Sequence, residues 1–265
     1  MSEKLKKLIV NIILLTLILP LGILFIWAIT SSWVYPNLIP NEFSLRGFEY
    51  ILNEENIKVL LNSIFISIVV VIITLIISIP AAKAIALYEF KGKKFFELLI
   101  LSPIIIPMIS VAMGIQLIFI KFGIANTLTG VILINIIPCI PYGVRIIADV
   151  YKLIGDKYEI QASMLGAKKI DILRYVTIPL ILPGIIGASS MCFIISFSQY
   201  FLTLLIGGGI VITYPLLMFP YIQSGDRILA SMYSIVFIII SLIVVMLMKK
   251  SLEKYYNKEN QDGIC

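Results

Sequence analysis

Histidine is absent from the 265 residues of this chain. Its absence removes the side chain that most often acts as a general base and as a metal ligand in proteins. Cysteine occurs three times, and no pair has the C-x-x-C spacing of a zinc or redox site. Cys139 and Cys192 lie inside apolar stretches, and Cys265 is the last residue. We therefore expect no metal site, no disulfide framework, no catalytic residues and no cofactor.

Charged side chains are also scarce. They make up 14 % of the chain, whereas apolar residues make up 60 %; soluble domains carry roughly 25 % charged residues. A chain of this composition cannot cover its surface with polar groups, so lipid must solvate part of it. The formal net charge is +6. Its Lys and Arg residues occur in short runs between apolar stretches, which is typical of membrane topology signals rather than of nucleic-acid binding.

Long apolar runs predict an all-α integral membrane protein with six transmembrane helices, because a bilayer core requires about 20 apolar residues per helix. The first run is too long for a signal peptide, and no A-x-A-like cleavage site follows it, so we expect a retained helix. Prolines inside the third, fourth and fifth runs favour kinked helices, although membrane helices also tolerate proline without a kink. The six runs lie at about 8–30, 59–87, 98–120, 125–148, 176–201 and 228–248.

Lysine and arginine are unevenly distributed between the connections of these runs. Seventeen of the 21 lie at the N-terminus, in the second-to-third and fourth-to-fifth connections and in the C-terminal tail; four lie elsewhere. Cytoplasmic connections carry the excess of positive charge, so both termini are predicted to be cytoplasmic. We expect three parts: an N-terminal helix with an external loop (1–58), a core of five helices (59–248) and a cytoplasmic tail (249–265).

The stretch from Tyr175 to Ser224 contains no charged residue over 50 positions, about twice the length that one helix needs. Its second half holds three consecutive glycines, at 207–209, and two prolines. We predict a glycine turn followed by a short helix that is tucked against the outer face or partly re-entrant. Two extra spans would instead place Arg227 and the C-terminus on conflicting sides of the membrane.

The longest cytoplasmic connection, 149–175, has a helical pattern that is interrupted by Gly166. Before this glycine, apolar residues recur every three or four positions, as on one face of a helix; they are Ile154, Tyr158, Ala162 and Leu165. After it, a second helical register begins at Ile170. Glycine is suited to the turn between two helices. An apolar stripe on a cytoplasmic helix needs cover from the membrane, from the chain itself or from a partner.

This connection resembles the cytoplasmic signature of the permease subunits of binding-protein-dependent ABC importers, which reads E-A-A, three residues, G, nine residues, I-x-L-P. Ala162 matches the third position of the triplet, Gly166 matches the glycine, and 176–179 reads Val-Thr-Ile-Pro. Ile160 and Gln161 replace the expected Glu and first Ala, while Glu159 places a carboxylate one position earlier. The resemblance covers roughly residues 59 to 248.

The resemblance implies the six-helix fold of a type I importer permease, in which this connection is the coupling helix that docks into an ATPase. The residues carried over to that role are Glu159, Ile160, Gln161, Ala162, Leu165, Gly166, Ala167, Ile178 and Pro179. The chain has no G-x-x-x-x-G-K-[ST] loop, so a partner chain would hydrolyse the ATP. The implied partners are two ATPase subunits, a second permease or a second copy of this chain, an extracytoplasmic binding protein and the lipid of a bacterial cytoplasmic membrane.

Two other classes of protein remain as alternatives. An ion-coupled secondary transporter usually carries charged residues at mid-membrane, and the centres of these runs contain none. A membrane enzyme would need an acid–base set, which is difficult to assemble without histidine. Among importers, the chain looks most similar to the second permease of the polyamine, iron(III), thiamine and phosphonate group. The resemblance suggests a polyamine as the first cargo to test, and iron(III), thiamine or a phosphonate as the alternatives.

Overall fold

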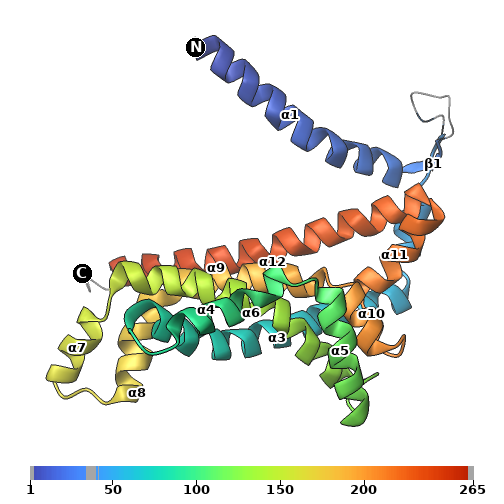
Figure 1. Ribbon diagram of the computed structural model, residues 1–265. Coiled ribbons are helices and arrows are strands. Elements are labelled where there is room, and N and C mark those ends of the chain that lie inside the picture. The colour runs from blue at the N-terminus through green and yellow to red at the C-terminus, as the bar shows by residue number, and fades with distance from the viewer. Residues whose placement is uncertain (1–2, 34–39, 41, 262–265) are drawn as a thin grey trace. The chain divides into compact units, whose positions relative to one another are not determined.

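The computed structural model describes residues 3–33, 40 and 42–261, and most of these residues are helical. Figure 1 shows the elements along the chain. Five helical segments are long and apolar enough to cross a membrane, one of which joins several consecutive elements. The bent pair α4–α5 provides a sixth crossing if it counts as one span, and with it the six-helix prediction is confirmed. The elements are α1 (Glu3–Ala28), β1 (Thr30–Ser32), β2 (Glu42–Phe43), α2 (Arg46–Ile51), α3 (Glu54–Leu87), α4 (Lys93–Ile105), α5 (Met108–Lys121), α6 (Leu128–Ile154), α7 (Lys157–Met164), α8 (Lys169–Ile172), η1 (Leu173–Thr177), α9 (Ile178–Phe197), α10 (Phe201–Gly207), α11 (Tyr214–Ser224) and α12 (Arg227–Gln261).

The third predicted span differs from the expectation of one helix at 98–120. The chain forms α4 and α5, which meet at an angle of 102°. Pro107 supplies no backbone N–H and restricts the residue before it to extended conformations. Ile106 accordingly has φ −87° and ψ 135°, which ends α4. Pro138 and Pro141, by contrast, lie inside α6 without ending it.

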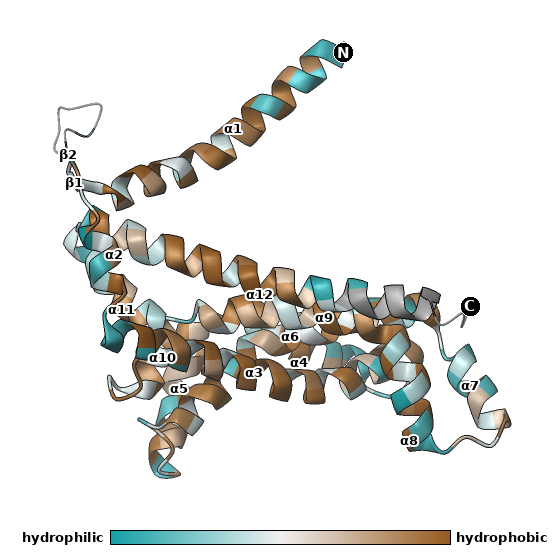
Figure 2. Ribbon diagram, turned by 180° about the vertical axis from the view of Figure 1, so that it is seen from behind, coloured by the Kyte–Doolittle hydropathy of each residue, from teal (hydrophilic) through white to brown (hydrophobic). Residues whose placement is uncertain are grey.

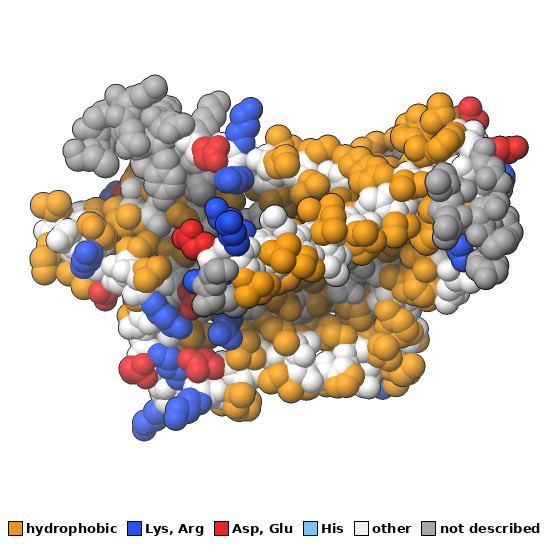
Figure 3. Space-filling model, turned by 90° about the horizontal axis from the view of Figure 1, so that it is seen from above, with side chains coloured by type: hydrophobic (Ala, Val, Ile, Leu, Met, Phe, Trp, Pro, Cys, Tyr) orange, Lys and Arg blue, Asp and Glu red, His pale blue; other side chains and the backbone are white. Residues whose placement is uncertain are grey.

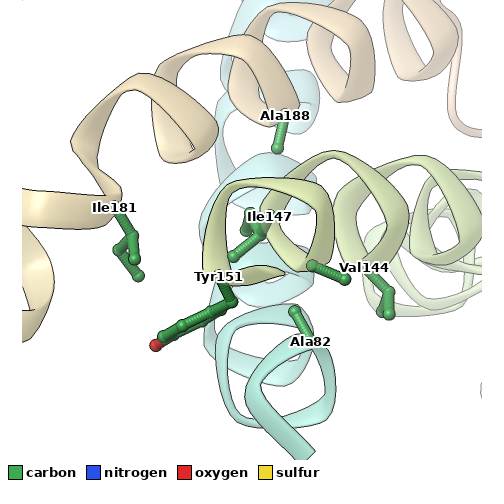
Figure 4. Close-up of a cluster of buried hydrophobic side chains, with 7 residues drawn as sticks. Ala82, Val144, Ile147, Tyr151, Ile181 and Ala188 are labelled. Atoms are coloured by element: carbon green, nitrogen blue, oxygen red, sulfur yellow. The ribbon is translucent and has the colours of Figure 1, made fainter. Parts of the chain in front are cut away.

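The chain divides into two compact units, residues 1–60 with 214–240 and residues 61–213 with 241–265. The core of the second unit lies where α3, α6 and α9 meet (Figure 4). The buried side chains of this cluster are Ala82, Val144, Ile147, Ala148, Tyr151, Ile181 and Ala188. α6 supplies four of the seven, and its buried face runs over nearly its whole length. This helix therefore organises the second unit.

Glycines allow the helices of the second unit to approach closely. A Cβ atom on Gly143 of α6 would lie 2.5 Å from Ser78 Oγ of α3, and one on Gly184 of α9 would lie 3.0 Å from Val150 Cγ2 of α6. Membrane helices use small residues at such contacts because lipid provides no hydrophobic force between them and close packing must hold them together.

The first unit contains α1, the two short strands, α2, the start of α3, α11 and the first part of α12. β1 pairs antiparallel with β2. Tyrosine hydroxyl groups link its helices: those of Tyr50 and Tyr221 are 2.5 Å apart, and that of Tyr233 donates to Asn56 Oδ1 over 3.2 Å. Figure 2 shows α1 as mostly hydrophobic, with hydrophilic residues toward its N-terminus. In the part of the chain that the structure describes, none of the most apolar 18 residues of α1 is buried.

Beyond α9, the charge-free stretch contains the predicted glycine turn. α10 ends at Gly207, and Gly208 and Gly209 both have positive φ values, 55° and 77°. The expectation of one short helix is incomplete, because the stretch forms two, α10 before the turn and α11 after it.

Figure 3 shows hydrophobic side chains over much of the molecular face that is in view, with charged side chains gathered in groups. This distribution is that of a protein solvated largely by lipid.

Candidate functional site

The connection between α6 and α9 folds into two short helices, α7 and α8 (Figure 1). α6 ends at Ile154 because Gly155 adopts φ +71°, a conformation that strongly favours glycine. The prediction that Ile154 to Leu165 form one face of a single helix is therefore wrong for Ile154. Ile154 belongs to α6, and α7 begins only at Lys157.

The end of α7 has the hydrogen bonds of a Schellman motif, in which a left-handed glycine closes a helix. The Ala167 N–H donates to the Ala162 carbonyl over 3.1 Å, and the Gly166 N–H donates to the Ser163 carbonyl over 3.0 Å. Gly166 has φ +83°. No other described atom lies within 4 Å of the position that a Cβ would occupy there. Glycine is therefore required by backbone conformation and not by crowding, and the predicted turn is confirmed.

After α8 the chain continues through η1, a turn of π-helix, directly into α9. π-Helical turns are rare and often occur at functional sites. Thr177 is the last residue of η1 and is buried, with 3 % of its surface exposed. Ile178 begins α9, and Pro179 follows it; because η1 runs directly into α9, the missing N–H of proline leaves a carbonyl of the preceding π-helical turn without a helical partner. The I-x-L-P-like segment thus spans the junction of η1 with α9, inside a helix that is long and apolar enough to cross a membrane.

Large apolar side chains of the connection are exposed. Leu165 is 88 % exposed, Met164 81 % and Ile170 73 %, and Ile160 is also exposed. Gln161 lies beside them on the outer surface of α7. Large exposed apolar side chains on a short polar connection favour contact with a further molecule.

Glu159 lies on the inner side of α7. Its Oε2 atom forms an ion pair with Lys83 Nζ of α3, and its Oε1 atom accepts a hydrogen bond of 2.6 Å from Thr177 Oγ1. These three residues line a cleft of about 510 Å³ together with residues of α7, α8 and η1. Among the described residues, no group of three or more His, Cys, Asp or Glu side chains is placed to hold a metal ion.

The structure separates the predicted site residues into two sets. Ala162, Gly166 and Ala167 form the turn, while Gln161 and Leu165 are exposed to solvent. Ile160 is exposed as well, but it lines the same cleft as Glu159. Glu159 instead faces inward, toward two residues that sequence reasoning did not select, Lys83 and Thr177. A lone lysine near the end of an otherwise apolar span was the available signal, because such a charge needs a partner.

Comparison with known proteins decides the family. Residues 75–254 match the sequence profile of a family described as "Binding-protein-dependent transport system inner membrane component". The chain belongs to this family. The matched range includes α4 to α11 and the whole connection between α6 and α9, so the permease signature lies inside it.

Several permeases are similar over most of their length. A 2-aminoethylphosphonate transport system permease protein of Salmonella paratyphi A is 25 % identical over 234 residues, covering 88 % of each chain. A spermidine/putrescine transport system permease protein of Haemophilus influenzae is 24 % identical over 206 residues, covering 77 % of this chain and 80 % of that one. This permease is therefore a multi-pass protein of the inner membrane.

A solved structure supports the same fold. The permease superposes with a TM-score of 0.71 on a chain of a bacterial ABC transporter involved in the import of the acidic polysaccharide alginate. The match covers 97 % of this chain and 99 % of the other, at 18 % sequence identity. The permease thus has the fold of a type I ABC importer permease, and the similarity at this level of identity concerns the fold alone.

Proposed function

We propose that this permease forms half of the membrane pathway of an ATP-driven importer and that α7 is the helix through which a partner ATPase moves it. The observation that carries the proposal is the exposed apolar end of α7. Leu165 and Met164 project from a helix that the Schellman motif closes. An amphipathic helix laid into a groove is a common mode of protein recognition, and a groove would remove these side chains from water.

The test replaces the most exposed apolar residue of the turn. Leu165→Asp should reduce the amount of ATPase recovered with the purified permease by about tenfold, because a charge would enter an apolar contact worth at least about 1.4 kcal/mol. Phe122→Asp is the matched control, since Phe122 is 76 % exposed at the end of α5, on the predicted external side. Equal recovery of the ATPase with Leu165→Asp and with wild type would refute the docking role.

The same proposal specifies the assembly. Two ATPase subunits bind two permease subunits, either two copies of this chain or this chain and a second permease, and a binding protein delivers the cargo from outside. ATP hydrolysis occurs in the partner chains. The family description names a binding-protein-dependent system, which supports the external partner. Two permeases that carry tags of different mass are expressed together, and the mass of the detergent-solubilised complex is measured. The mass shows whether the complex contains two copies of this chain or one copy of each permease.

Both termini are proposed to be cytoplasmic, because the positively charged connections lie on their side. Cys265, which reports on the C-terminus, lies outside the described residues. A membrane-impermeant thiol reagent should label Cys265 in inverted membrane vesicles and leave it unlabelled in intact cells. Labelling in intact cells would reverse the orientation and would place α7 on the wrong side for an ATPase.

The proposed cargo is a polyamine, with a phosphonate as the second choice. Two relatives that cover most of the chain are named for spermidine/putrescine and for 2-aminoethylphosphonate, and both kinds of compound carry amino groups. Two of the carboxylates on the predicted outer side have local partners. Glu54 pairs with Lys58 over 2.6 Å, and Asp226 accepts a hydrogen bond from the Leu229 N–H over 3.1 Å.

We therefore assign selectivity to the binding protein rather than to the permease. Calorimetric titration of the binding protein encoded beside this chain with spermidine, putrescine, 2-aminoethylphosphonate, ferric ion and thiamine measures the preference directly. Tight binding of a compound other than a polyamine would overturn the choice of cargo and leave the role of the permease intact. A tight, selective site on the purified permease alone would overturn the assignment of selectivity.

A further inference from the structure

One carboxylate joins three elements of the second unit. Glu159 lies near the start of α7, Lys83 lies in the last turns of α3, and Thr177 lies at the junction of η1 with α9. Both oxygen atoms of the carboxylate are used, since Lys83 Nζ contacts Oε2 and Thr177 Oγ1 donates to Oε1. α3 and the helix that contains α9 are both long and apolar enough to cross the membrane. The contact therefore connects a cytoplasmic helix to two spans at once.

This contact is more shielded from water than the other ion pairs formed by described residues. The side chains of Lys83 and Glu159 are 29 % and 17 % exposed, whereas those of Lys152 and Asp149, 3.4 Å apart at the end of α6, are 58 % and 60 % exposed. Exposed pairs contribute little because solvent screens them. Shielded, hydrogen-bonded pairs are stronger, and removal of one partner leaves the other charge unsatisfied.

The backbone on either side of α7 offers less restraint than this contact does. Gly155 and Gly166, which flank the helix, have φ values of +71° and +83°. No other described atom lies within 4 Å of the Cβ position of either glycine. Each glycine can change its φ and ψ angles with little steric resistance. A push on α7 alone would therefore turn it about its two ends unless a side chain of the helix fixed it to the spans.

We propose that Lys83, Glu159 and Thr177 form a clasp that transmits the movement of α7 to α3 and α9, so that the ATPase and the pathway move together. The inference rests on the proposed function, because it assumes that an ATPase moves α7. It assigns a mechanical role to Lys83, which lies outside the permease signature, and to the carboxylate one position before the signature. Neither residue contacts the cargo, so both are positioning residues.

The clasp distinguishes docking from transmission. Met164 and Leu165 are strongly exposed and free to meet a partner, while Glu159 contacts the chain's own spans. Loss of the clasp should therefore leave the ATPase bound and hydrolysing ATP while the pathway no longer follows. The quantity that reports this defect is the number of cargo molecules imported per ATP hydrolysed.

The experiment uses the complete importer, reconstituted in proteoliposomes from this permease with the ATPase and binding protein encoded beside it, and the cargo that the titration selects. Glu159→Gln should retain ATPase recovery and ATP hydrolysis within about twofold of wild type and should lower import per ATP by about tenfold. Lys83→Met should behave in the same way. Asp149→Asn, in the exposed pair, is the matched control and should leave import per ATP unchanged.

The charge-exchanged variant Lys83→Glu with Glu159→Lys tests the pairing itself. It should restore at least half of the wild-type import per ATP, because the Thr177 hydroxyl can accept from a lysine as well as donate to a carboxylate. Unchanged import per ATP in Glu159→Gln would overturn the clasp, as would a loss of ATPase recovery, which would make Glu159 a docking residue. If wild type itself neither binds the ATPase nor imports any tested cargo, the proposed function fails and not the clasp alone.

Discussion

Gly143→Ala tests the close packing of α3 against α6. The added methyl group would lie 2.5 Å from Ser78 Oγ, 3.2 Å from Ser78 Cβ and 3.3 Å from Thr74 Cγ2. The hydroxyl can rotate away without losing a bond, since the buried Ser78 Oγ has no hydrogen-bond partner among the described residues. The two carbon contacts are not relieved by that rotation, so Ser78 and Thr74 must move by a few tenths of an ångström against their packed surroundings.

Overpacking of this kind costs about 1–3 kcal/mol. For a chain of this size each kcal/mol lowers the melting temperature by about 2–4 °C, so Gly143→Ala should lower the apparent melting temperature of the purified permease by roughly 2–12 °C. Thermal scanning of the detergent-solubilised protein by size-exclusion chromatography measures the shift. Ser78→Ala added to Gly143→Ala removes the closest atom and should recover a substantial part of the loss.

Gly114→Ala is the matched control. Gly114 lies in the middle of α5, and no other described atom lies within 4 Å of its Cβ position. Alanine is favoured over glycine inside a helix by up to about 1 kcal/mol, so this variant should be as stable as wild type or more stable. A Gly143→Ala protein with wild-type stability, or one that Ser78→Ala does not improve, would contradict the packing argument.

Three further predictions concern local features. Gly166→Val should weaken ATPase recovery and import more than Gly166→Asn, because φ +83° disfavours β-branched residues far more than asparagine; equal effects would contradict this account of the turn. Cys139 and Cys192 are buried in α6 and α9, so thiol reagents should label them only after denaturation, as peptide mass spectrometry would record. Asp226→Ala should destabilise the start of α12 by about 1 kcal/mol through loss of the bond to the Leu229 N–H, and Asp226→Asn should retain most of the wild-type melting temperature.

The sequence predicts the spans well because the signal for each is local. A run of about 20 apolar residues specifies a membrane helix wherever it occurs. α3 ends at the predicted residue and α12 begins beside its predicted start, but α12 continues as a helix to Gln261, beyond the predicted end of the span at 248. The break at Pro107 is less predictable, because proline in a membrane helix can be tolerated, can kink the helix or can end it. Pro107 ends a helix, whereas Pro141 does not.

The turn at Gly166 was predictable from the change of helical register on its two sides. The φ angle of Gly166, +83°, agrees with a turn at this residue. The partner of Glu159 was not predictable. Lys83 lies 76 positions earlier in the chain, and no periodicity connects residues of different helices at that separation. The role of Glu159 was also difficult to predict because the signature places its acidic residue at position 160, which is Ile160 in this chain.

The break between α4 and α5 has a consequence for the boundary between the permease and its solvent. A helix end leaves carbonyl groups without helical partners, and hydrocarbon offers them no donor. The Ile106 N–H satisfies the Ser102 carbonyl over 2.9 Å, but the chain then turns by 102°, away from the carbonyl groups of the last turn of α4. These groups need donors from water, from another polypeptide or from this chain, because lipid tails supply none. We therefore expect water or protein, rather than lipid tails, beside Pro107.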